Sequence, residues 1–144
     1  MGTFFISFII LIPLSYIIGS INSSIIFSKI YKLPDPRDYG SKNPGATNIL
    51  RSGNKFLALT ILIFDVFKGF LPVFLAYYFI EDKLYVQIIG LVAVIGHILP
   101  IFYNFKGGKG VATALGSILG FDLILGVICL LTWLITAFLF RYSA

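Results

Sequence analysis

The chain has 144 residues, of which 58% are hydrophobic and only 12% are charged, with a net charge of +5. Soluble domains carry about 25% charged residues, so this composition excludes a soluble globular domain and predicts an all-α integral membrane protein. The basic residues alternate with apolar runs of bilayer length, which argues against nucleic acid and favours anionic lipids and phosphate compounds as partners.

The first apolar run predicts a membrane span. Residues 1–28 have no charged side chain, and about 20 helical residues suffice to cross the hydrocarbon core. No positive segment precedes this run, so we expect it to remain in the membrane rather than to be removed as a signal peptide. Residues 29–55 then mix charge with Pro, Gly and Asn, which predicts a long polar loop.

Two further spans follow. Residues 56–80 are apolar except for Asp65 and Lys68, and residues 84–105 lead into a glycine-rich break at residues 106–110. Residues 111–140 fit either one long kinked helix or a half-helix followed by a span, and the length of 123–140 favours the second interpretation. We therefore predict a polytopic helical bundle of about four spans, with a half-helix after the glycine-rich loop.

The distribution of positive charge predicts the orientation. Only Lys83 and Arg141 flank the spans on one side, whereas the first polar loop and the glycine-rich loop carry the other cations, which predicts that both loops face the cytoplasm. Ala112, Gly116 and Gly120 recur every fourth residue and predict close helix packing, within the chain rather than across a dimer. The oligomeric state stays open.

The first polar loop contains a set of residues suited to a dianion. Hydroxyls, amides and cations occur together in residues 40–51 without any acidic residue, and Pro44 and Gly45 fit a turn before a short helix. An ordinary basic interfacial loop is the alternative interpretation. The candidate residues of this loop are Ser41, Asn43, Gly45, Thr47, Asn48 and Arg51.

The glycine-rich loop is the second candidate phosphate site. Its glycines allow an anion to approach the backbone, and the next helix points its N-terminal amides at the same place. The pattern is neither a Walker A motif nor a dinucleotide fingerprint, and a plain turn is the alternative. The candidate residues are Lys106, Gly107, Gly108, Lys109, Gly110 and Thr113.

The spans contain ionisable residues that we interpret as structural. Asp65 and Lys68 are one helical turn apart and can pair, and no carboxylate stands near His97 in the sequence, so we expect a neutral His97 that orients the neighbouring loop. The single cysteine, Cys129, excludes a disulfide framework, and no metal site is predicted.

These motifs resemble the bacterial acyl-phosphate:glycerol-3-phosphate acyltransferases. The matching segments follow the order and spacing of that family, up to Tyr142 and Ser143: residues 19–21, 33–37, 40–51, 64–69 with Pro72, and 96–113. The resemblance implies a bacterial inner-membrane enzyme of phospholipid biosynthesis. It implies long-chain acyl phosphate as donor, glycerol 3-phosphate as acceptor, lysophosphatidate and phosphate as products, and no cofactor.

The chemistry of the residues agrees with that donor. Other glycerolipid acyltransferases use a His followed five residues later by Asp, but here Phe102 occupies that position after His97. An acyl phosphate is already activated, so the protein needs mainly to hold two phosphates and align the acceptor hydroxyl. Our hypothesis gives the catalytic roles to Ser41, Arg51 and Lys109, with the departing phosphate accepting the hydroxyl proton.

The sequence departs from the family at its C-terminal side. We expect residues 1–144 to form a single transmembrane acyltransferase domain that lacks the family's later helices and third motif. An inactive truncated member, a partial chain and a shortened enzyme are the alternatives. A small membrane transporter subunit is a competing class, based on the charged residues Asp65, Lys68 and Asp122.

Overall fold

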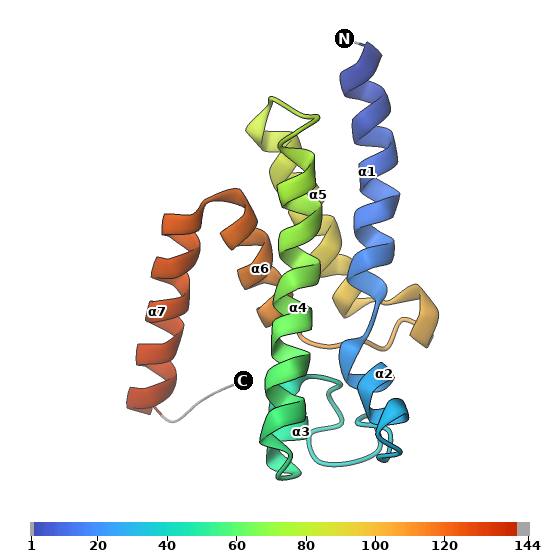
Figure 1. Ribbon diagram of the computed structural model, residues 1–144, viewed down its shortest axis with the longest axis vertical. Helices are drawn as coiled ribbons and strands as arrows, with labels where there is room; N and C mark the ends of the chain where they lie inside the picture. Colours follow the sequence, from blue (N-terminus) through green and yellow to red (C-terminus); the bar gives the residue numbers. More distant parts are fainter. Residues whose placement is uncertain (1, 141–144) are drawn as a thin grey trace.

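The protein is a bundle of helices, shown in Figure 1 as a computed structural model that describes residues 2–140, with side chains from residue 6 onward. Arg141, Tyr142 and Ser143, which contributed to the sequence-based predictions, lie outside the described residues. The elements are α1 (Gly2–Ser20), α2 (Ser23–Ile30), α3 (Ala46–Arg51), α4 (Lys55–Ala76), α5 (Lys83–Ile98), the 3-10 helix η1 (Ile101–Tyr103), α6 (Val111–Phe121) and α7 (Leu123–Phe140).

The helix lengths confirm a polytopic membrane protein. Three segments of the described chain are long and apolar enough to cross a bilayer, namely Lys55–Ala76, Lys83–Tyr103 and Leu123–Phe140. A fourth crossing results if Ile6–Ser20 and Ser23–Ile30 act as one bent span. Helix α6 has only 11 residues and is the predicted half-helix after the glycine-rich loop.

The first span is bent, not continuous as residues 1–28 had suggested. Helices α1 and α2 meet at an angle of 44°. Asn22 is extended at the break, and its side-chain oxygen accepts a hydrogen bond from the N–H of Ile25 at 3.1 Å. Because this cap satisfies one free amide of α2, Asn22 starts a new helix inside an apolar run.

Glycines allow α6 to lie directly against α4. A side chain at Gly69 would collide with the carbonyl of Thr113, and a side chain at Gly116 would collide with the carbonyl of Val66. Gly120 also lies close to α4, so the predicted packing of this small-residue repeat within the chain is confirmed. Close backbone approach increases dispersion contacts, which stabilise helix pairs where lipid supplies no hydrophobic driving force.

Helices α1 and α5 form a second close pair. Gly19 of α1 leaves no space for a side chain beside the carbonyl of Ala93. The hydroxyl of Ser15 donates a hydrogen bond to the carbonyl of Ile89 at 2.7 Å, and both residues are buried. The bundle core therefore combines α4 with α6 and α1 with α5.

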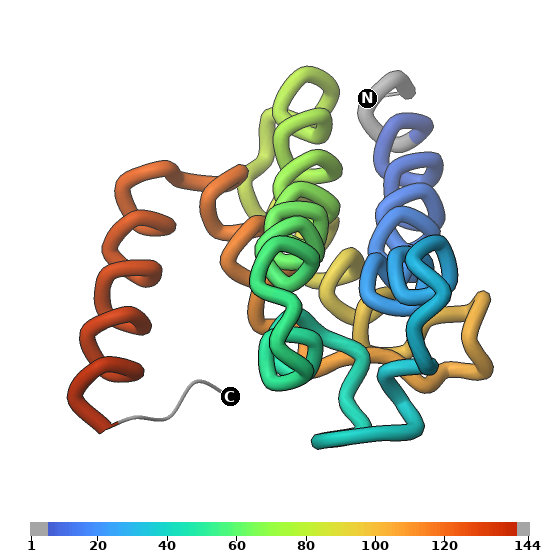
Figure 2. Tube along the Cα trace, turned by 60° about the horizontal axis from the view of Figure 1, so that its bottom comes forward, coloured from blue at the N-terminus to red at the C-terminus, as the bar shows by residue number. Residues whose placement is uncertain are grey.

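Helix α7 stands at the edge of the bundle, as Figure 2 shows. Gly126 is its one buried residue among those described, and it lies against Leu119 of α6. Asp122 accepts a hydrogen bond from the N–H of Leu125 at 2.9 Å and so caps the start of α7. The remaining faces of α7 are apolar and exposed, as in a helix surrounded by lipid.

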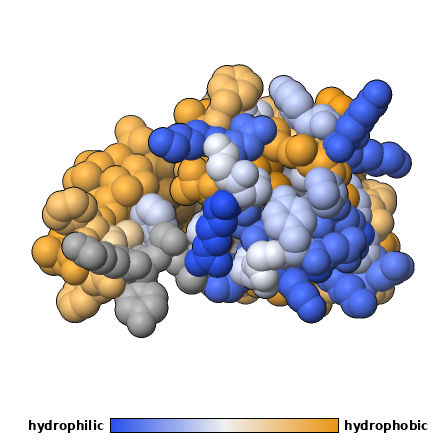
Figure 3. All heavy atoms as spheres, turned by 90° about the horizontal axis from the view of Figure 1, so that it is seen from below, coloured by the Kyte–Doolittle hydropathy of each residue, from blue (hydrophilic) through white to orange (hydrophobic). Residues whose placement is uncertain are grey.

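The two basic loops lie at the same end of the bundle. Residues 31–54 lie at the lower end in Figures 1 and 2, and residues 104–110 run through the lower half of the molecule above them. Seen from below in Figure 3, hydrophilic residues gather over this end, whereas the α7 side stays hydrophobic. The prediction that both loops lie on one side is thereby confirmed.

We predict that Gly116→Ala lowers the stability of the bundle, because the added methyl group would press on the Val66 carbonyl of α4. Overpacking of this kind costs about 1–3 kcal/mol. Thermal unfolding in detergent measures the effect. Val127→Leu, which also adds one carbon but on an exposed face of α7, is the control and should unfold at the wild-type temperature.

Candidate functional site

Asn48 organises the first polar loop. Its amide nitrogen donates to the carbonyls of Pro36 at 2.8 Å and Tyr39 at 3.2 Å, and its oxygen accepts from the N–H of Ser41 at 3.0 Å. The residue is only 1% exposed. Sequence analysis gave Asn48 a direct phosphate contact, but the structure uses this amide inside the loop, where it sets the position of Ser41.

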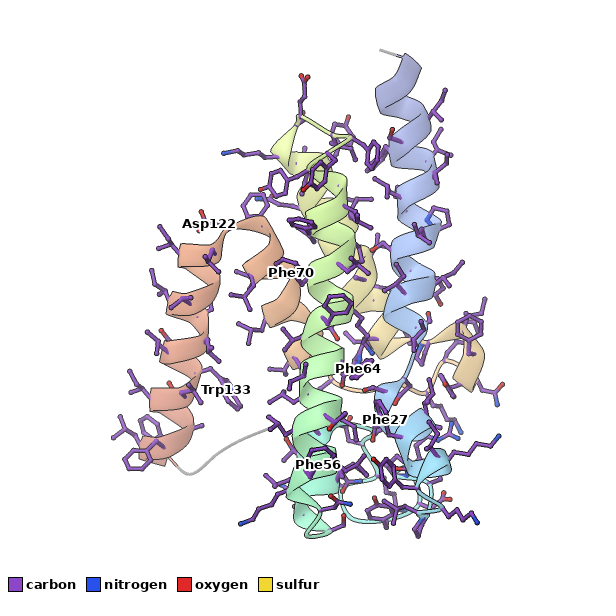
Figure 4. The ribbon with its side chains drawn as sticks, viewed as in Figure 1. Phe27, Phe56, Phe64, Phe70, Asp122 and Trp133 are labelled. Atoms are coloured by element: carbon purple, nitrogen blue, oxygen red, sulfur yellow. The ribbon has the colours of Figure 1, made fainter. Side chains whose placement is uncertain are left out.

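The short helix α3 holds the same loop on the bundle. Ile49 is fully buried in a cluster with Leu57, Ala58 and Ile61 of α4. Gly45 is the N-cap of α3, without a side-chain cap. The short helix after Pro44 and Gly45 is the one that the sequence predicted. Figure 4 shows Phe27 of α2 beside Phe64 of α4. Their rings pack edge to face, with the ring centroids 5.1 Å apart.

An ion pair that sequence analysis missed lies on the loop. The Arg37 guanidinium contacts the Asp35 carboxylate through Nη2 at 2.7 Å and Nε at 3.0 Å. The hydrogen bond from the Arg37 side chain lowers the pKa of Asp35 and raises the pKa of Arg37. The signal available in the sequence was an acid and a base two positions apart on either side of a proline.

The glycine-rich loop is tied to the end of α5. The N–H of Gly107 donates to the carbonyl of Ile98 at 3.2 Å, and the N–H of Gly108 donates to the carbonyl of His97 at 3.1 Å. These two amides therefore hold the loop on the end of α5 in this structure. Gly108 also packs on the His97 ring with no space for a side chain.

The start of α6 is the open part of this loop. Gly110, with φ +80°, is the N-cap of α6, and no side chain caps the helix. The first N–H groups of a helix are free donors, and the helix dipole adds partial positive charge to them. In this loop, the groups most available to an anion are therefore the free N–H groups at the beginning of α6 and the side chains of Lys106 and Lys109, both of which are exposed.

A buried ionic cluster lies beneath the loop. Lys68 Nζ is 2.8 Å from Asp65 Oδ1, which confirms the predicted pair. Ser23 donates a hydrogen bond to the same carboxylate oxygen at 2.8 Å. His97 Nδ1 lies 3.8 Å from Asp65 Oδ1, so a carboxylate does stand near His97, although α4 supplies it from far away in the sequence.

The two loops enclose one cleft. Its volume is about 540 Å³. Of the predicted residues, Lys106 and Gly107 line it, whereas Ser41, Arg51 and Lys109 do not. Sequence analysis missed the other lining residues, which are Asp35, Arg37, Asp38, Lys42, Pro44 and Asn104.

The remaining predicted residues do not line the cleft. Arg51 is exposed at the end of α3, and Asn43, Gly45 and Thr47 are half-buried before and inside that helix. Thr113 is 0% exposed and packs against α4, so its hydroxyl is not at the surface. The motif alone could not show that Lys42 lines the cleft whereas its neighbours Ser41 and Asn43 do not.

The cleft can bind a phosphate compound. Lys42 and Lys106 reach it from different loops, and neither forms an ion pair among the described residues, whereas Arg37 is held by Asp35. The carboxylates of Asp35 and Asp38 also line the cleft, and Arg37 neutralises that of Asp35, so the two lysines supply cations from different loops that suit a dianion. The three residues that suggested transport have other partners. Asp65 pairs with Lys68, and Asp122, which is labelled in Figure 4, caps α7.

We predict that Asn48→Ala loosens the first loop, because the carbonyl of Pro36 and the N–H of Ser41 both lose their partner. Leaving such groups unpaired costs about 1–3 kcal/mol. Hydrogen exchange of residues 36–41 should become faster. Asn54→Ala removes the cap of α4 instead and should leave this exchange unchanged; equal exchange in both variants would contradict the role of Asn48.

We also predict that Arg37→Gln raises the pKa of Asp35 toward 3.8, as measured by NMR of the carboxyl carbon. Because the folded pKa is lowered, the pair stabilises the fold above the unfolded pKa, and this stabilisation is lost as pH falls through the lowered folded pKa. The side chains are 31% and 28% exposed, so the contribution stays below about 1 kcal/mol. Lys83→Gln, far from the pair, should leave the Asp35 pKa unchanged.

Comparison with known proteins gives the family. A family model described as "Glycerol-3-phosphate acyltransferase" matches residues 9–144. The glycerol-3-phosphate acyltransferase of Legionella pneumophila subsp. pneumophila (strain Philadelphia 1) is 50% identical over 137 residues, which are 95% of this chain and 50% of that protein. The enzyme of that name from Colwellia psychrerythraea is 52% identical over 130 residues, covering 90% of this chain and 66% of its own.

Solved structures agree with the sequence comparison. The crystal structure of PlsY (YgiH), an integral membrane glycerol 3-phosphate acyltransferase in its glycerol 3-phosphate form, has a TM-score of 0.88 at 35% identity. It covers 95% of this chain and 68% of its own. Thus the chain spans about half the length of the Legionella relative and about two thirds of the solved structure. With its apolar helices and its match over residues 9–144, this chain is an integral membrane protein of the glycerol-3-phosphate acyltransferase family.

Proposed function

We propose that the protein transfers a long-chain acyl group from acyl phosphate to glycerol 3-phosphate, giving lysophosphatidate and inorganic phosphate. One observation carries the proposal: two basic loops, far apart in the sequence, line one cleft in a chain of this family. Both substrates carry phosphate, and the cleft with its surroundings offers cations from each loop.

The two phosphates are assigned to the two loops. Arg51 and the hydroxyl of Ser41 receive one phosphate on the side of the first loop. Lys106, Lys109 and the open N-terminus of α6 receive the other. Lys42 lines the cleft, and its positive charge reduces the repulsion of two dianions.

The reaction needs alignment more than activation. The acceptor hydroxyl oxygen attacks the acyl carbon and forms the new ester bond, while the bond from that carbon to the phosphate oxygen breaks. The departing phosphate takes the hydroxyl proton, so charge and atoms balance without a basic side chain. Holding both substrates in a fixed geometry converts this step into an effectively unimolecular one.

Residues 1–144 act as one transmembrane acyltransferase domain in this proposal, with both loops on the cytoplasmic side of the bacterial inner membrane. The excess of Lys and Arg in these loops supports that orientation, because cytoplasmic loops of membrane proteins are enriched in them. Substrates made in the cytoplasm would then reach the cleft directly.

The proposal is tested by phosphate release from a synthetic long-chain acyl phosphate, with and without glycerol 3-phosphate, using protein in lipid. We expect release that requires the acceptor and falls about 10²-fold in Lys106→Ala and Arg51→Ala, as when a transition-state donor is lost. Lys83→Ala, which removes a lysine at the opposite end of the bundle, is the control and should keep full activity.

Release that is independent of glycerol 3-phosphate would indicate hydrolysis of the acyl phosphate rather than acyl transfer. Equal loss in Lys106→Ala and Lys83→Ala would show that the effect is one of general charge, and the assignment of the cleft would then be wrong.

A further inference from the structure

Buried polar contacts surround the break in the first span, and the ring of His97 lies between them and the glycine-rich loop. At the break, the carbonyl of Ile21 accepts a hydrogen bond from Lys68 Nζ at 2.7 Å. Lys68 pairs with Asp65, and Asp65 accepts from Ser23 at the start of α2. The carboxylate and ammonium groups therefore contact both sides of the break, and their side chains are only 4% and 8% exposed.

The same cluster reaches the loop through His97. The imidazole Nδ1 is 3.8 Å from Asp65 Oδ1, and the opposite edge of the ring packs on Gly108. The carbonyl of His97 also receives the N–H of Gly108 at 3.1 Å. His97 Nδ1 has no hydrogen-bond partner among the described residues, so charge proximity to Asp65 and packing of the ring on Gly108 make up this link.

A purely stabilising role explains this arrangement poorly. Each charge at membrane depth costs about 2.5–3.5 kcal/mol, and apolar replacement of a buried pair is often neutral or stabilising. The pair instead contacts the break between α1 and α2 on one side. On the other side it lies beside His97, on which Gly108 of the glycine-rich loop packs.

We propose that Asp65, Lys68 and His97 are positioning residues that set the place of the glycine-rich loop, and with it Lys106 and the start of α6, relative to the first loop. This inference rests on the proposed function only for its effect on substrate affinity. Its structural part is testable without any activity, because the amides of Gly107 and Gly108 report the loop directly.

The first test compares two buried serines of the first span. Ser23→Ala removes the hydrogen bond to Asp65, whereas Ser15→Ala removes an equally buried bond to the carbonyl of Ile89 outside the cluster. We expect hydrogen exchange of the Gly107 and Gly108 amides to rise at least about threefold in Ser23→Ala and to stay at the wild-type rate in Ser15→Ala. Unchanged or equally raised exchange in both variants would overturn the proposal.

The second test removes the charges together. Asp65→Asn combined with Lys68→Met leaves no unpaired buried charge but removes the donor to the Ile21 carbonyl, so it should fold with a melting temperature lowered only by the loss of that hydrogen bond. We expect its glycine-rich loop to exchange faster, and its affinity for glycerol 3-phosphate, measured by calorimetry, to fall about tenfold. Wild-type exchange and wild-type affinity in this variant would show the pair to be a structural contact only.

The two readouts separate this inference from the proposed function. If wild-type protein binds no glycerol 3-phosphate, the proposed function fails, but the exchange of Gly107 and Gly108 still decides the positioning role. If binding is normal and exchange is unaffected in both Ser23→Ala and the double variant, the positioning role alone is wrong.

Discussion

The close contact between α4 and α6 determines where the glycine-rich loop can lie. Because Gly69 and Gly116 have no side chains, the two backbones meet, and the short α6 is supported along its length. A half-helix of 11 residues is too short to cross the hydrocarbon core by itself and needs such support. The loop before α6 is thereby held at the polar end of the bundle, beside the first loop.

The charges inside the spans serve this geometry. Asp65 and Lys68 neutralise each other, and each also contacts backbone or side-chain groups at the α1–α2 break. A helix break leaves carbonyls without partners, which lipid cannot satisfy. Lys68 supplies a donor to one of them, so a residue that composition alone marks as costly stabilises the bend that leads the chain into the first polar loop.

The donors of the two loops divide into those that hold the loop and those that face the cleft. The amides of Asn48, Gly107 and Gly108 are consumed by internal hydrogen bonds. Lys42 and Lys106 remain directed at the cleft. A site that binds dianions needs both kinds, because cations bind tightly only when the backbone that carries them is held in place.

The sequence by itself determined the membrane class, the spans, the half-helix and the identity of the two basic loops. These follow from local quantities: the length of an apolar run against the thickness of the bilayer, and the excess of Lys and Arg between runs. The motifs that carry the family resemblance are also local, and the comparison over residues 9–144 agrees with them. The pairing of Asp65 with Lys68 was within reach for the same reason, since both lie on one helical turn.

Only the tertiary structure decided which donors are free. The contact of Lys68 with the Ile21 carbonyl at the bend, the approach of Asp65 to His97 and the cleft lined by Lys42 and Lys106 all join residues that are distant in the chain. Their positions depend on backbone contacts between helices, and no pattern within one segment encodes the partner. A motif therefore predicts which residue types surround the phosphate, whereas packing decides which of their N–H groups remain available to bind it.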